Sequence, residues 1–121
     1  MLELLSNLPD RVVGVRASGW VGAEDYASVL TPAAEAAIAR HGRVRVLYEI
    51  GPDFQGYTPG AMWDDMRLGL SHLRAWERIA VVTDNEWIAG AMRMFLFAMP
   101  FPSKVFKLAE MPQALEWIVA E

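Results

Sequence analysis

The apolar and polar positions at the start of the chain predict a β-hairpin. A short apolar run occupies residues 1–5, and a Val-rich, partly alternating segment occupies residues 11–18. Between them, Ser6, Asn7, Pro9 and Asp10 form a cluster of turn-forming residues. Alternation and β-branched residues are typical of strands, so the two runs are expected to pair across this turn.

A helical pattern follows over residues 22–41. Its apolar positions recur with the spacing of one helical face, at Tyr26, Val29, Leu30, Ala33 and Ala37. Gly42 is a natural stop for this helix. Thr31-Pro32 resembles a cap followed by Pro at the first helical position, which fits either two short helices or one kinked helix.

The rest of the chain alternates between strand and helix patterns. The predicted strands cover residues 43–50, 78–83 and 103–108, with Val44, Val46 and Tyr48 on one face of the first, and residues 51–56 form a loop. The predicted helices cover residues 58–76, a segment capped by Asp84 or Asn85 that ends at Phe97, and residues 110–120. This alternation implies parallel strands joined by right-handed crossovers. With the opening hairpin, it predicts one α/β domain over residues 1–121, with a mixed five-stranded sheet flanked by about four helices.

Composition excludes several classes of protein. The chain has 121 residues, of which 54% are hydrophobic and 21% charged, so it lacks the composition of a disordered chain. A net charge of -4 argues against a nucleic-acid partner, which normally requires a basic face. The chain has no Cys, no uncharged apolar run of about 18 residues and no basic leader. We therefore expect a cytoplasmic protein.

Several segments together resemble one family. They are Val13-Gly14-Val15-Arg16-Ala17-Ser18-Gly19, Asp25-Tyr26, Gly60-Ala61-Met62-Trp63-Asp64-Asp65-Met66-Arg67-Leu68-Gly69-Leu70, His72-Leu73, Glu77-Arg78-Ile79-Ala80-Val81-Val82-Thr83-Asp84 and Trp87. The chain resembles the SpoIIAA-like proteins, whose fold is shared by STAS domains and the lipid-binding CRAL-TRIO domain. The resemblance implies a mixed five-stranded sheet, a homodimer, association with lipids or membranes, and a regulatory role without catalysis.

Thr58 is a candidate phosphorylation site through the same resemblance. The anti-sigma-factor antagonists of this fold carry a phosphorylatable Ser at the start of the helix after the third strand. This chain has Gly56-Tyr57-Thr58-Pro59-Gly60 there, without the expected Asp-Ser-Ser, so only Thr58 can take that place. The alternative is that the Thr58 hydroxyl is simply the N-cap of the helix.

The stretch over residues 92–102 is apolar except for Arg93. A helix buries only part of its circumference against a sheet, so this stretch needs additional cover. Extra core or a dimer contact would supply it. The alternative is a flap that contacts a membrane through its apolar side chains, while nearby basic side chains pair with the lipid headgroups. The residues assigned to this contact are Phe97, Met99, Phe101, Arg93 and Lys104.

Methionine and tryptophan are concentrated on the two helices around this stretch. Met adapts to irregular apolar partners, so a plastic pocket for an apolar ligand is conceivable between the helices, although ordinary core packing explains the same stripe. The residues assigned to ligand binding are Met62, Trp63, Met66, Trp87, Met92 and Phe95.

No catalytic or metal site is expected. The acidic and His candidates are Glu49, Asp53, Asp64, Asp65 and His72. Asp65 and His72 lie two helical turns apart, about 10 Å along the axis, which is too far for a direct hydrogen bond. The sequence has no nucleophile elbow, phosphate loop or dinucleotide fingerprint, and it predicts a non-enzymatic protein without a cofactor.

Overall fold

The computed structural model describes residues 1–71 and 74–120, except for the side chains at positions 62, 64–66, 69 and 70. Its sheet has five strands in the order β1-β2-β3-β4-β5. The strands are β1 (Leu2–Leu4), β2 (Val12–Val21), β3 (Val44–Tyr57), β4 (Trp76–Val82) and β5 (Ser103–Phe106). β1 pairs antiparallel with β2, and every other pair is parallel. The predicted hairpin and mixed sheet are therefore confirmed.

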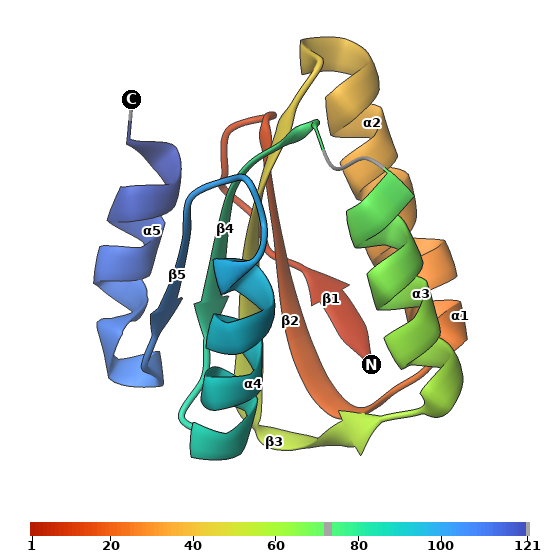
Figure 1. Ribbon diagram of the computed structural model, residues 1–121, viewed down its shortest axis with the longest axis vertical. Helices are drawn as coiled ribbons and strands as arrows, with labels where there is room; N and C mark the ends of the chain where they lie inside the picture. Colours follow the sequence, from red (N-terminus) through yellow and green to blue (C-terminus); the bar gives the residue numbers. More distant parts are fainter. Residues whose placement is uncertain (72–73, 121) are drawn as a thin grey trace.

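Helical segments cover both faces of this sheet (Figure 1). They are α1 (Ala23–Asp25), the π-helical η1 (Tyr26–Leu30), α2 (Thr31–His41), α3 (Pro59–Ser71), α4 (Glu86–Phe97), the 3-10 turn η2 (Leu108–Glu110) and α5 (Met111–Val119). The first three are continuous, so the segment before Gly42 is one helical run with a π-helical stretch ahead of Pro32. Gly42 ends that run in the left-handed conformation, with φ 75°, which favours glycine.

The two sheet faces have separate cores. One contains residues of η1, α2, α3 and α4 packed on the predicted face of β3, where Val44, Val46 and Tyr48 are buried. The other contains Leu47 with Ala114 and Ile118 of α5. In Figure 1, α5 accordingly lies on the opposite side from α1, α2 and α3. The first face, which is covered by the continuous η1–α2 segment, α3 and α4, carries the candidate site.

The predicted loop at residues 51–56 is wrong, because β3 continues through it to Tyr57. Phe54 pairs with Gly19 and Tyr57 pairs with Val21 of β2. The register shifts between Ala17 and Gly19 and again at Trp20, which is how a bulge absorbs residues poorly suited to a regular ladder. Gly51 and Pro52 predict the end of the strand, but in the structure they lie in its irregular part.

The predicted end of the helix near Trp76 is also wrong. α3 ends at Ser71, and Trp76 begins β4, where it is buried opposite Val44. A large aromatic side chain fits the buried face of either element, so the helical pattern was extended too far. At the start of α4, the open choice of cap falls on Asn85, whose side chain accepts a 3.0 Å hydrogen bond from the Ile88 amide.

Arg45 is the buried charge that joins the sheet to the end of α5. It is 4% exposed, and its Nε donates to Glu77 Oε1 at 2.7 Å while its Nη1 donates to the carbonyls of Ile118 and Ala120. The hydrogen bond from Arg45 is the main cause that lowers the pKa of Glu77. The stabilisation from this lowered pKa is therefore present at neutral pH and lost as the pH falls below about 4, where the unfolded glutamate takes up its proton.

We expect Arg45→Met to lower the free energy of unfolding by about 3 kcal/mol, because Glu77 and the carbonyls of Ile118 and Ala120 each lose a hydrogen bond from a buried charged donor. Arg43→Met is the matched control. Arg43 also pairs with Glu77, at 3.1 Å, but its side chain is 63% exposed, so a loss below about 1 kcal/mol is expected. Urea unfolding at pH 7 measures both, and equal losses would contradict the role given to Arg45.

Candidate functional site

A cavity of about 340 Å³ lies between the sheet and α4, and its lining also includes Leu68 of α3. Its floor is formed by alternate residues of two adjacent strands, and these are Val46, Tyr48 and Ile50 of β3 and Ile79 and Val81 of β4. Alternation places these side chains on the same face of the sheet. The volume falls within the range of small-molecule sites, which is roughly 300–1,000 Å³.

One face of α4 forms a wall of the cavity. The lining residues of this helix are Trp87, Ile88, Ala91, Met92, Phe95 and Leu96. They recur with the three- and four-residue spacing of a helical face. Leu96 is buried, whereas Trp87 is 80% exposed and Phe95 is 38% exposed. The wall therefore reaches from the core to solvent, and Trp87 and Phe95 lie at the mouth of the cavity.

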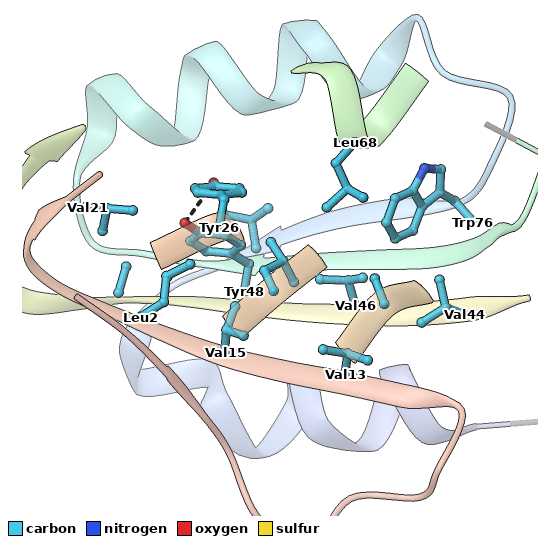
Figure 2. Close-up of a cluster of buried hydrophobic side chains, with 14 of the residues drawn as sticks. Leu2, Val13, Val15, Val21, Tyr26, Val44, Val46, Tyr48, Leu68 and Trp76 are labelled. Carbon is cyan, nitrogen blue, oxygen red and sulfur yellow. Dashed lines mark hydrogen bonds between the residues drawn. The ribbon is translucent and has the colours of Figure 1, made fainter. Parts of the chain in front are cut away.

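Three tyrosines bring hydroxyl groups to this face of the sheet. The Tyr57 hydroxyl donates to the Tyr48 hydroxyl at 3.0 Å, and the Tyr48 and Tyr26 hydroxyls are 3.1 Å apart. Figure 2 shows the Tyr26–Tyr48 hydrogen bond at the opposite end of the buried cluster from Trp76. Tyr48 and Tyr57 both line the cavity. All other described lining residues are aliphatic, Met, Phe or Trp, so the polar side-chain groups of the described lining are the Tyr48 and Tyr57 hydroxyls and the indole N–H groups of the two tryptophans.

The structure brings together some of the residues predicted to bind a ligand. Trp87, Met92 and Phe95 line the cavity. Trp63 is 61% exposed and is not among the described lining residues. The side chains of Met62 and Met66 lie outside the described part of the structure. The binding role of all six residues stays a prediction.

Several cavity residues are not among those predicted to bind a ligand. Tyr48, Tyr57, Trp76 and Ile79 line the cavity and belong to β3 and β4. The sequence placed Tyr48 on the buried face of a strand, but this periodicity could not show that part of the face borders a cavity. It placed Trp76 in a helix and gave no signal for a binding role of Tyr57 or Ile79.

Four of the five residues predicted to contact a membrane fall into two groups. Phe97 is 92% exposed, and Arg93 is exposed on the same helix. Met99 and Phe101 are half-buried and line the cavity instead. Met94, which was not assigned to the contact, is 80% exposed. The outer surface of α4 formed by Met94 and Phe97, with Arg93, is called the outer α4 face below.

Lys104 is not brought together with the outer α4 face. Its ammonium lies 5.4 Å from the ring centroid of Trp117, which belongs to α5 on the other side of the sheet. The Arg78 guanidinium lies 5.3 Å from the same ring. These cation–π distances explain the position of Lys104 without a lipid.

Thr58 occupies the N-cap position of α3. Its Oγ1 accepts a hydrogen bond from the Ala61 amide at 3.2 Å. Thr58 is half-buried. The capping interpretation is therefore supported by geometry, and its phosphorylation stays a prediction.

We expect Thr58→Ala to lower the free energy of unfolding by about 1 kcal/mol, because the Ala61 amide loses its acceptor. Thr58→Ser keeps the hydroxyl and should restore most of this loss. Thermal or urea unfolding of the two variants checks the cap. Equal destabilisation by Ala and Ser would show that the Thr58 methyl group matters instead.

The acidic candidates do not form a described site. Glu49 pairs with Arg16 at 3.8 Å, and Asp53 is exposed. The side chains of Asp64 and Asp65 and all of His72 lie outside the described residues. Among the side chains that the structure describes, no group of three His, Cys, Asp or Glu residues could hold a metal ion. Within residues 1–71 and 74–120, no helix combines the length and apolar character that a membrane crossing requires.

Comparison with known proteins identifies the family. A family model described as SpoIIAA-like matches residues 12–119. The chain belongs to the SpoIIAA-like family. This SpoIIAA-like protein is similar to a crystal structure described as an uncharacterized protein from the DUF3478 family with a SpoIIAA-like fold, from Shewanella loihica PV-4. The two share 28% sequence identity and a TM-score of 0.74, over 98% of this chain and 92% of that chain.

The expected family and fold are thus confirmed. No protein with a curated description matches this SpoIIAA-like chain significantly. The SpoIIAA-like and STAS fold suggests a regulatory or interaction module, and domains of this kind are generally non-enzymatic.

Proposed function

We propose that this SpoIIAA-like protein binds an apolar small molecule or lipid in the cavity beneath α4. The observation that carries the proposal is the cavity itself, about 340 Å³ in volume and lined by apolar and aromatic side chains. Protein interiors normally leave few voids larger than a water molecule. A ligand of matching shape would stabilise the folded protein, because it supplies the van der Waals contacts that the side chains lining an empty cavity lack.

We further propose that the protein reaches its ligand at the surface of a membrane. Phe97 and Met94 are highly exposed near the end of α4, and Arg93 directly precedes Met94 in sequence. Exposed aromatic and Met side chains beside a basic residue suit the interface of a bilayer. Because α4 also forms the cavity wall, movement of α4 toward the lipid would open the cavity. On this proposal the protein works in the cytoplasm, at the inner face of the membrane.

A second candidate is a regulatory interaction module, most simply a homodimer. The outer α4 face favours it as well, since exposed apolar side chains on a small domain often mark protein contacts. The two candidates differ in one respect. A dimer through this face requires no ligand in the cavity, whereas the lipid proposal requires one.

Titration of the protein with naphthalene, followed by calorimetry, tests the ligand proposal. Naphthalene is uncharged, rigid and small enough for the cavity. We expect saturable binding to one site and a higher melting temperature in its presence, because only the folded state binds. A calorimetric titration without saturable heat, together with an unchanged melting temperature, would contradict the proposal.

A further inference from the structure

Tyrosine hydroxyls and the Trp76 ring lie toward different ends of the cavity. Tyr48 and Tyr57 line one part of it, and their hydroxyls are hydrogen-bonded to each other. Trp76 lines the cavity at the start of β4, paired with Val44 at the other end of the same strands. In Figure 2, Trp76 lies across the cluster from the Tyr26–Tyr48 pair, with Val46 between them.

The strand register gives this separation a scale. Trp76 pairs with Val44, and Tyr48 lies four residues after Val44 on β3. At about 3.3 Å per residue, these two positions are roughly 13 Å apart along the strands. A long, narrow ligand along the strands would therefore place one end near the tyrosines and the other near Trp76.

The volume limits the size of the ligand. A cavity of about 150 Å³ is known to hold benzene, with its six carbon atoms, in another protein. In proportion, about 340 Å³ has room for roughly a dozen non-hydrogen atoms. Larger molecules would extend through the mouth between Trp87 and Phe95.

The chemistry of the lining limits the charge of the ligand. Among the described lining residues there is no Lys, Arg, His, Asp or Glu. A buried carboxylate or ammonium would thus lack an ionic partner here, which is costly. A hydroxyl group carries no such cost, and because it both donates and accepts, it can hydrogen-bond with a tyrosine hydroxyl in either direction.

We infer that the cavity binds a neutral, single-chain amphiphile with a terminal hydroxyl group, oriented with that group at Tyr48 and Tyr57 and its chain toward Trp76. This inference rests on the proposed function and names the ligand class for the same cavity. It predicts a preference for an uncharged alcohol over the carboxylate of the same chain length.

Calorimetric titration with n-decanol and with decanoate at pH 7 tests this preference. We expect n-decanol to bind about tenfold more tightly or better, because decanoate must bury its charge without a partner. The Tyr57→Phe variant keeps the ring and removes the hydroxyl. It should weaken n-decanol binding about three- to tenfold relative to naphthalene binding, since naphthalene makes no such hydrogen bond.

The outcomes separate this inference from the proposed function. If naphthalene binds but decanoate binds as tightly as n-decanol, or if Tyr57→Phe leaves n-decanol binding unchanged relative to naphthalene binding, the inference is overturned and the proposed function stands. If neither naphthalene nor n-decanol binds, both fail. Naphthalene serves as the control for folding, because a misfolded Tyr57→Phe variant would lose naphthalene binding as well.

Discussion

We expect the double variant Val81→Phe/Met92→Trp to bind naphthalene about tenfold more weakly or worse, a loss of ~1.4 kcal/mol or more. Val81 is on the floor of the cavity and Met92 on its α4 wall, so the added rings occupy the space of the ligand from two sides. The new side chains fill an existing void, so little overpacking is expected. Calorimetric titration measures the affinity, and thermal unfolding shows that the variant is folded.

Met94→Trp is the matched control for this variant. Met94 lies two residues further along α4 but points to solvent, at 80% exposure, and is not among the described lining residues. We expect it to bind naphthalene as the wild type does. If Met94→Trp weakens binding as much as the double variant, naphthalene binds on the outer α4 face and not in the cavity.

We expect Met94→Asp/Phe97→Asp to abolish flotation with phosphatidylglycerol vesicles. Full burial of a large apolar side chain contributes about 1.5–3 kcal/mol, so loss of two such contacts should lower partitioning more than about a hundredfold. Both residues are highly exposed, and the substitutions therefore leave the core intact. Flotation of the wild type and the variant, with tryptophan emission recorded in the same fractions, measures the effect.

The control for charge is Ala109→Asp/Gln113→Asp. It adds the same two negative charges at exposed positions in η2 and α5, on the other side of the sheet from α4. This variant should float nearly as well as the wild type. If the Met94/Phe97 variant instead disrupts a dimer, and the wild type never binds vesicles, the interaction-module candidate replaces the membrane proposal.

The architecture could be predicted because its signals are local. The hairpin, the parallel alternation and the Gly42 stop each depend on residues close together in the sequence, and all three appear in the structure. The errors lie where tertiary pairing decides the outcome. Strand β3 continues past Gly51 and Pro52 because β2 is beside it, and Trp76 leaves the predicted helix because the core accommodates it in β4.

The candidate site was only partly predictable. An apolar stretch over residues 92–102 indicates that some side chains need cover, but not which of them obtain it. In the structure, Met99 and Phe101 turn inward and Phe97 turns outward. The three hydroxyl groups come from Tyr26 of η1 and from Tyr48 and Tyr57 of β3, and they meet only after folding. A cavity is space that no residue occupies, so no single position in the sequence encodes it.

The central claim is that an apolar ligand occupies the cavity beneath α4, and intermolecular NOEs to bound naphthalene test it most directly. We predict NOEs from the naphthalene protons to the methyl groups of Ile79, Val81 and Met92, which line the cavity from the floor and the wall. NOEs confined to the Met94 methyl group would place the ligand on the outer surface, and that result would contradict the claim.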